Sequence, residues 1–181
     1  VVQKAIETVT DEVRSALIDE LRGHVEECVR DQNGNHVIQK CIEHVPANKV
    51  DFIIGSFYGK VLTLAKHPYG CRVVQRVLEF CTGVQKSPVL KEVMDGCKDL
   101  ILDQYGNYVI QHILTRGIPK NRNYIIKKVK DNILEFSRHK FASNVVEKAL
   151  QNSDRCTRGD LILAILELGT NGLLRFLNLT K

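Results

Sequence analysis

Pairs of adjacent apolar residues recur along the chain at a constant interval, as Val37-Ile38, Val73-Val74, Val109-Ile110 and Val145-Val146. Successive pairs are 36 residues apart, because 73 − 37, 109 − 73 and 145 − 109 all equal 36. A second apolar pair follows four residues later, as in Cys41-Ile42 and Ile113-Leu114. This spacing places all four side chains on one buried stripe of an α-helix. A period of this length is typical of a solenoid.

Turn signals divide each repeat into three predicted helices. A short apolar stretch precedes the helix with the apolar pairs, and Gly34, Gly70, Gly106 or Ala142 separates the two. Breaks such as Val45-Pro46 end that helix. A third helix follows, and its predicted inward-facing residues are Ile54, Phe57, Leu90, Val93, Ile126, Val129, Ile162 and Ile165. None of these helices can bury its apolar face alone, so the sequence predicts an all-α fold, a crescent-shaped right-handed α-solenoid of stacked three-helix repeats.

The period divides the chain into four complete repeats, at residues 23–58, 59–94, 95–130 and 131–172. Residues 1–22 are interpreted as the end of a further copy, because Gln3 lies 36 residues before Gln39. Residues 173–181 are interpreted as the start of the next copy. We therefore expect one repeat domain that is truncated at both ends.

The composition favours a helical protein, since the chain has no Trp and only 4 Pro and 12 Gly among its 181 residues. The six cysteines include no C-x-x-C pair, and we interpret them as reduced thiols of an intracellular, cytoplasmic protein. No apolar run is long enough to span a membrane, so no membrane partner is expected. The net charge of +5 permits an anionic partner without requiring one.

Each apolar pair lies inside a five-residue window, at residues 35–39, 71–75, 107–111 and 143–147. Counted from the first residue as position 0, the apolar pair occupies +2 and +3. On an α-helix, positions 0 and +4 lie about 40° apart and +1 lies about 100° from position 0. We therefore expect positions 0, +1 and +4 to form a small exposed patch, and the patches of stacked repeats to align in a row.

The side chains of these patches suit the recognition of nucleobases. Position +4 is Gln in three windows and Glu147 in the fourth. Glutamine offers a donor and an acceptor, whereas a carboxylate offers only acceptors, which suits the N1–H and N2–H₂ donors of guanine. Position +1 includes planar groups that stack on bases, and its residues are His36, Arg72, Tyr108 and Asn144. Position +5 adds a mostly basic row suited to phosphates, formed by Lys4, Lys40, Arg76, His112 and Lys148.

Two other interpretations are open on the residues alone. A helical scaffold would carry the same repeats and bind protein partners, or nucleic acid without sequence preference. An enzyme finds support only in the spacing of His67 with Cys71 and of His139 with Ser143, which suits a base and a nucleophile. Neither pair has an evident orienting carboxylate or oxyanion site. The spacing of cysteines and histidines does not match a zinc site. We expect no catalytic residue, metal or cofactor.

The windows and the turns before them resemble the Pumilio (PUF) family of RNA-binding repeats. The resemblance rests on residues 31–36, 67–72, 103–108 and 139–144 together with the windows, and it extends over nearly the whole chain. It implies that the four windows correspond to repeats four to seven of eight. It also implies single-stranded RNA as the partner, bound on the concave face at one base per repeat. Regulation of messenger RNA through 3′ untranslated regions and protein co-regulators is implied as well.

The family's code, carried over by this resemblance, assigns one base to each window. Asn with Gln implies uracil for the windows at 35–39 and 107–111. Cys with Gln implies adenine at 71–75, and Ser with Glu implies guanine at 143–147. The family binds RNA antiparallel to its repeats, so the windows spell 5′-GUAU-3′, part of a UGUA element. The expected base-edge residues are Gln3, Asn35, Gln39, Cys71, Gln75, Asn107, Gln111, Ser143 and Glu147.

Overall fold

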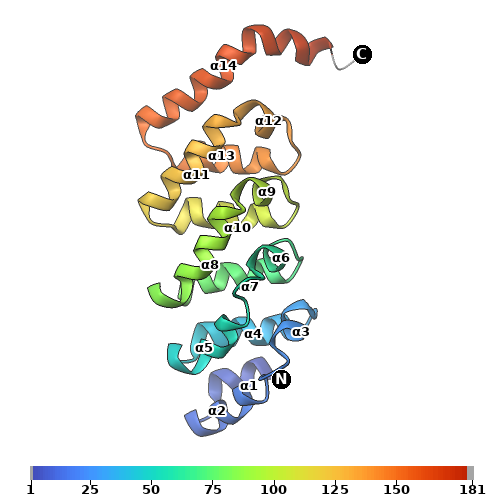
Figure 1. The fold of residues 1–181 in the computed structure, drawn as a ribbon, viewed down its shortest axis with the longest axis vertical. Helices are drawn as coiled ribbons and strands as arrows, with labels where there is room; N and C mark the ends of the chain where they lie inside the picture. Colours follow the sequence, from blue (N-terminus) through green and yellow to red (C-terminus); the bar gives the residue numbers. More distant parts are fainter. Residues whose placement is uncertain (1, 179–181) are drawn as a thin grey trace. The chain divides into compact units, whose positions relative to one another are not determined.

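The computed structural model describes the backbone of residues 2–178 and the side chains of residues 2–166. All the regular secondary structure within these residues is helical. The chain forms two compact units, residues 1–100 and 101–181. Figure 1 shows the order of the helices along the chain.

The first unit repeats a three-helix pattern. Helix α3 packs against α4, and α6 packs against α7, so each short helix covers the longer helix that follows it. The longer helices of successive repeats lie side by side, α1 against α4 and α4 against α7. The helices are α1 (Val2–Thr8), α2 (Asp11–Asp19), α3 (Val25–Arg30), α4 (Gly34–His44), α5 (Ala47–Gly55), α6 (Val61–Ala65), α7 (Gly70–Phe80) and α8 (Gly83–Asp95), and α9 (Cys97–Leu102) crosses the unit boundary.

The second unit follows the same pattern. Helix α10 packs side by side with α13, and α12 covers α13. Its remaining helices are α10 (Gly106–Arg116), α11 (Pro119–Asp131), α12 (Ile133–Arg138), α13 (Ala142–Asn152) and α14 (Arg155–Asn178). The prediction of an all-α solenoid built from three-helix repeats is therefore confirmed.

The predicted apolar stripe forms the core of each unit. Four side chains of the stripe are fully buried, namely Ile38, Cys41, Ile110 and Leu114. Val37 is half-buried. Burying one such aliphatic side chain stabilises the fold by about 1.5–3 kcal/mol. The stripe turns the opposite side of each of these helices outward, and the window residue at position +1 is exposed there.

The cysteines belong mostly to this core. Cys41, Cys71, Cys81 and Cys97 are buried, and none of the six cysteines forms a disulfide. Burial raises the pKa of Cys41 to about 12 and that of Cys81 to about 11, so both stay protonated. Cys28 is half-buried and Cys156 is exposed.

The prediction for the third helix of the last repeat is wrong at one position. Ile162 is 44% exposed, and Leu161 is the buried residue. Position 161 matches the buried Val89 and Ile125 in the 36-residue frame. The counterpart of Ile162 in the preceding repeat is Ile126 of α11, a helix that also packs against α12 and α13 of the following repeat.

Residues 155–178 form the single continuous helix α14. The sequence instead divides this stretch between a third helix and the first helix of another repeat, beginning at residue 173. The side chains of residues 173–181 lie outside the described residues, so their assignment to a further repeat stays a prediction.

The window helices begin at Gly34, Gly70, Gly106 and Ala142, one residue before the windows that were predicted to open them. Glycine is required at Gly34 and Gly70 by close approach of the preceding short helix. A Cβ atom would lie 2.7 Å from the backbone oxygen of Cys28 at the first position and 2.5 Å from that of Leu64 at the second. The short helix therefore packs tightly on the start of the window helix and fixes the direction in which the window residues project.

Candidate nucleic-acid interface

An aspartate holds the turn before two of the window helices. Oδ1 of Asp31 accepts hydrogen bonds from the backbone N–H groups of Asn33 (2.9 Å) and Gly34 (2.6 Å). These bonds, that from Gly34 above all, lower the pKa of Asp31 below its ordinary range. Oδ1 of Asp103 accepts equivalent bonds from Tyr105 (2.8 Å) and Gly106 (2.7 Å). The carboxylate thus stabilises the turn as an Asx motif.

A histidine takes the same place before the other two window helices. Nδ1 of His67 accepts from the backbone N–H groups of Tyr69 (3.2 Å) and Gly70 (3.3 Å). Nδ1 of His139 lies 3.3 Å from the N–H groups of the two matching residues, 141 and 142. Burial, and to a smaller extent the charge of Arg30, lowers the pKa of His67. Both imidazoles therefore act in turn formation as acceptors through Nδ1.

These contacts bear on the enzyme interpretation. A general base needs a free lone pair directed at the nucleophile, and Nδ1 of His67 and of His139 is engaged by backbone amides. Sγ of Cys71 donates to the carbonyl of Pro68 (3.5 Å), and Oγ of Ser143 to that of Lys140 (3.3 Å). The four-residue spacing is explained by the turn and does not require catalysis.

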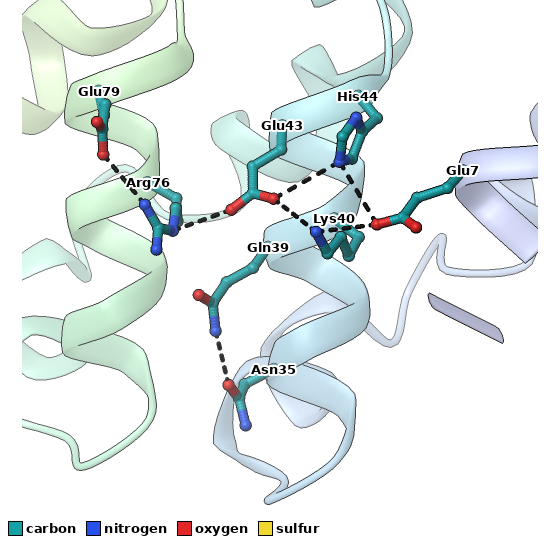
Figure 2. A network of polar contacts seen from close by, with 8 residues as sticks. All are labelled: Glu7, Asn35, Gln39, Lys40, Glu43, His44, Arg76 and Glu79. Atoms are coloured by element: carbon teal, nitrogen blue, oxygen red, sulfur yellow. Dashed lines mark hydrogen bonds and ion pairs between the residues drawn. The ribbon is translucent and has the colours of Figure 1, made fainter. Parts of the chain in front are cut away.

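The side chain at position 0 donates to the carbonyl three residues earlier in all four windows. In the first window, Nδ2 of Asn35 donates to the carbonyls of Gln32 (2.8 Å) and Asp31 (2.9 Å). Because both amide protons point at backbone oxygens, Oδ1 of Asn35 faces along the helix toward Gln39. Nε2 of Gln39 donates to it at 2.8 Å (Figure 2). The turn therefore orients, through the asparagine, the base-edge residue at position +4, which we call the reader of its window.

The third window repeats this arrangement. Nδ2 of Asn107 donates to the carbonyls of Asp103 (2.8 Å) and Gln104 (3.0 Å). Nε2 of Gln111 donates to Oδ1 of Asn107 at 2.8 Å. The same pair of side chains thus takes the same conformation in the two units, which is expected if both serve one recognition task.

The expectation that position 0 belongs to an exposed patch is wrong in three windows. Asn35 and Asn107 are each 1% exposed, and Cys71 is 4% exposed. Their side chains turn back toward the carbonyls of the preceding turn, a contact that helical periodicity does not reveal. Position 0 therefore lines the base of the patch in these windows, while Ser143 is half-buried.

The readers at position +4 differ in their burial and in the hydrogen bonds that hold their side chains. Gln39 is 9% exposed and Gln111 half-buried, each bonded to its asparagine. Nε2 of Gln75 donates instead to the backbone oxygen of Cys71 at 3.1 Å. Gln3 is exposed on α1. In each bonded pair the glutamine donates through Nε2 to its asparagine.

Glu147 is exposed, and its carboxylate accepts a hydrogen bond from a residue one turn later on the same helix. Oε1 of Glu147 accepts from Nε2 of Gln151 at 2.9 Å. The amide oxygen of Gln151 in turn accepts from Nζ of Lys148 at 3.0 Å. Gln151 was not among the sequence-predicted site residues, although its position, four residues after Glu147 on one helix, is a sequence signal for contact.

The residues at position +1 are exposed in all four windows, as expected of stacking groups. Tyr108 has 54% of its surface exposed, and His36, Arg72 and Asn144 are also exposed. Each follows position 0 of its window, which is buried in three windows and half-buried at Ser143. The exposed +1 side chains are therefore the groups of each window that a ligand meets first.

Two cations of the basic row at position +5, Lys40 and Arg76 of the first unit, are paired with carboxylates. Nζ of Lys40 lies 2.9 Å from Oε1 of Glu7 and 3.1 Å from Oε2 of Glu43. Arg76 pairs with Glu43 (3.0 Å) and Glu79 (3.1 Å). The sequence interpretation missed these carboxylates, although they recur at position +8 in the same 36-residue frame.

Neither a cluster of metal-binding side chains nor a membrane-spanning helix occurs within the part of the chain that the structure describes. Among the described side chains, no three His, Cys, Asp or Glu residues are grouped so that they could hold a metal ion. No helix in the described part of the chain is long and apolar enough to cross a membrane.

Comparison with known proteins places these windows in a family context. The model of the Pumilio-family RNA binding repeat matches residues 1–22, 24–55, 60–94, 96–130 and 132–155, most of the chain. No protein of curated function matches the chain.

Solved structures of RNA complexes are similar to the chain over nearly its whole length. PUF-8 in complex with PBE-RNA is 36% identical, with a TM-score of 0.85 over 90% of this chain and 48% of its own. The Puf3 RNA-binding domain bound to site A of the Cox17 RNA 3′ UTR is 42% identical, with a TM-score of 0.84 over 89% and 49%. Yeast Puf5p bound to SMX2 RNA is 30% identical, with a TM-score of 0.75 over 96% and 55%. The chain thus spans about half the length of these structures.

Proposed function

Because the chain belongs to the Pumilio family of RNA-binding repeat proteins, we propose that it binds single-stranded RNA by sequence, with one base at each window. The observation that carries the proposal is the Asn–Gln pair that recurs with the same hydrogen bonds in α4 and α10. The same pair, held by the same turn contacts at the same place in two repeats, supports a common recognition task.

The chemistry of each window supports a base assignment. A glutamine side chain offers one donor and one acceptor, which match either the uracil edge (O4 and N3–H) or the adenine edge (N1 and N6–H₂). The choice between these bases therefore falls on position 0. The asparagine of windows 35–39 and 107–111 is assigned uracil, and the smaller, apolar Cys71 is assigned adenine, in accordance with the family's code.

Window 143–147 is assigned guanine. The Glu147 carboxylate has only acceptor oxygens, and guanine presents two adjacent donors, N1–H and N2–H₂. Uracil and adenine would each place an acceptor against this carboxylate, which costs the hydrogen bond and adds electrostatic repulsion. Read antiparallel, the four windows specify 5′-GUAU-3′ within a UGUA element.

The proposed biological role is post-transcriptional regulation of messenger RNA in the cytoplasm, together with protein co-regulators. It is supported by the solved relatives whose RNA is a 3′ UTR recognition sequence, such as Puf3 with Cox17 RNA. Stacking on the exposed +1 side chains supplies affinity that does not depend on sequence, about 1–3 kcal/mol for each base stacked on an aromatic ring. The +4 readers supply the discrimination.

The decisive experiment measures binding of the 181-residue chain to 5′-UGUAUAUA-3′ and to its single-base variants. Replacing the G is expected to weaken binding by about 1–3 kcal/mol, the range for a well-made base contact. Replacing the last base, which lies outside the four complete windows, is expected to cost less. Equal losses at the two positions would contradict the assignment, and indifference to all RNA with binding of a peptide would favour a protein scaffold.

A further inference from the structure

A row of acidic residues lies beside the proposed readers. Positions 0, +4 and +8 of a helix occupy successive turns on one side, with +8 about 80° from position 0. Position +8 is Glu7 in α1, Glu43 in α4 and Glu79 in α7. Carboxylates at this place repel RNA phosphates, so their recurrence on an RNA-binding face requires an explanation.

Glu43 is the centre of an alternating set of charges. Its side chain is only 16% exposed, and its two oxygens contact Nζ of Lys40 on its own helix and Nε of Arg76 on α7, at 3.1 and 3.0 Å (Figure 2). Lys40 also reaches Glu7 of α1, and Arg76 reaches Glu79. We name this set, Glu7, Lys40, Glu43, Arg76 and Glu79, the charge ladder. It spans three helices that pack side by side.

The charge ladder neutralises two of the cations that the sequence offers to phosphates, Lys40 and Arg76. Three carboxylates face two cations, so these five groups carry no excess positive charge. The bonds of Lys40 to Glu7 and then to Glu43 raise its pKa, which shows that its ammonium interacts favourably with both carboxylates. Position +5 lies one turn beyond the stacking residue at +1, so unpaired cations at this place would meet the backbone of any bound RNA.

We propose that Glu43 is a specificity-determining residue, which pairs with Lys40 and Arg76 and so suppresses binding of RNA irrespective of its sequence. This inference rests on the proposed RNA-binding function. Phosphate contacts add affinity for every sequence, whereas contacts with base edges carry the discrimination. Glu43 shifts the balance from the first kind of contact to the second.

The test replaces the carboxylate by its isosteric amide, Glu43→Gln, and measures affinity for oligo-C and for 5′-UGUAUAUA-3′ between 50 and 200 mM salt. Each cation released to a phosphate steepens the slope of log K against log salt by about 0.7 for single strands. Lys40 keeps Glu7 and Arg76 keeps Glu79 in this variant, so both cations are paired less tightly but neither is set free. The added loss of affinity over this range is therefore expected to reach at most about threefold, the value for one whole cation. Oligo-C is expected to gain more affinity at low salt than the UGUA octamer, because its backbone is free to shift onto the less tightly paired cations.

The matched control is Glu20→Gln, which makes the same change of charge at the exposed C-cap of α2. It is expected to leave affinity and slope unchanged, and an equal gain in this control would overturn the proposal in favour of net charge. Unchanged oligo-C binding and slope in a folded Glu43→Gln variant would also overturn it. If that variant fails to fold, Glu7→Gln replaces it. A smaller gain in oligo-C affinity is then expected, because Lys40 keeps Glu43. No gain would again contradict the proposal.

A wild-type chain that binds oligo-C and the UGUA octamer equally well contradicts the proposed function instead.

Discussion

The turns held by aspartate and those held by histidine build two different kinds of window on the same backbone. Asp31 and Asp103 precede an asparagine at position 0, whereas His67 and His139 precede a cysteine and a serine. Both residue types accept the same two backbone N–H groups. The difference lies in the next step, where the asparagine orients the glutamine at +4 and the smaller side chains do not.

The comparison shows how one scaffold supports several specificities. The carbonyl at position −3 accepts from position 0 in every window, from Nδ2 of Asn35 or Oγ of Ser143 for example. Because this acceptor is backbone, exchange of the residue at position 0 does not require a new turn. Specificity is therefore carried by side chains that the fold tolerates as alternatives.

The largest expected effect is the loss of stability when a buried asparagine is removed. Asn35→Ala deletes two bonds to backbone carbonyls in a site that is 1% exposed, and leaves the carbonyl of Gln32 without this donor. We expect a loss of about 1–3 kcal/mol in the free energy of unfolding, measured by urea denaturation. Ser143→Ala, at a half-buried site with one bond of 3.3 Å, is the matched comparison and should cost less. Equal losses would show that the two kinds of window do not differ in this way.

A second prediction concerns pH. The folded pKa of His67 is lowered, so its contribution to stability is present above the ordinary histidine value of about 6.5 and is lost as the pH falls through the lowered pKa. Asp31 also has a lowered pKa, so it keeps its bonds until the pH falls below the ordinary range of a carboxyl. Between pH 7 and 5, protection of the Gly70 amide from hydrogen exchange should fall relative to that of Gly34, after correction for intrinsic rates. The variant His67→Asp should abolish this difference, and a difference that survives in the variant would contradict the account.

The smallest effect is expected at Gln151. A glutamate there would face Glu147 one turn away, and like charges at this spacing destabilise a helix by about 0.2–0.5 kcal/mol. Gln151→Glu should therefore weaken binding of the G-containing octamer by about twofold, since the carboxylate of Glu147 loses the N–H donor that holds it. Gln151→Ala serves as the control that removes the donor without adding charge. An unchanged affinity in both variants would show that Gln151 does not position the reader.

The helices and their buried faces could be predicted from the sequence because the 36-residue period aligns apolar residues whose only stable place is the core. The start of each window helix was predicted to within one residue, because a glycine or alanine precedes each window. The burial of Asn35 could not be predicted, because an asparagine amide is compatible with solvent or with a turn, and only the turn geometry decides. The pairing of Lys40 with Glu7 and Glu43 was present in the periodicity at +8 but required knowledge of which helices lie side by side.

The central claim, that positions 0 and +4 of a window specify a base, is tested most directly by converting one kind of window into the other. The variant Ser143→Asn with Glu147→Gln gives window 143–147 the pair found at 35–39 and 107–111, with the carbonyl of Lys140 as the available acceptor. Affinities for octamers with G or U at the corresponding base should reverse, so that U is preferred over G by about tenfold or more. A variant that remains folded yet still prefers G, or binds neither octamer, would contradict the account.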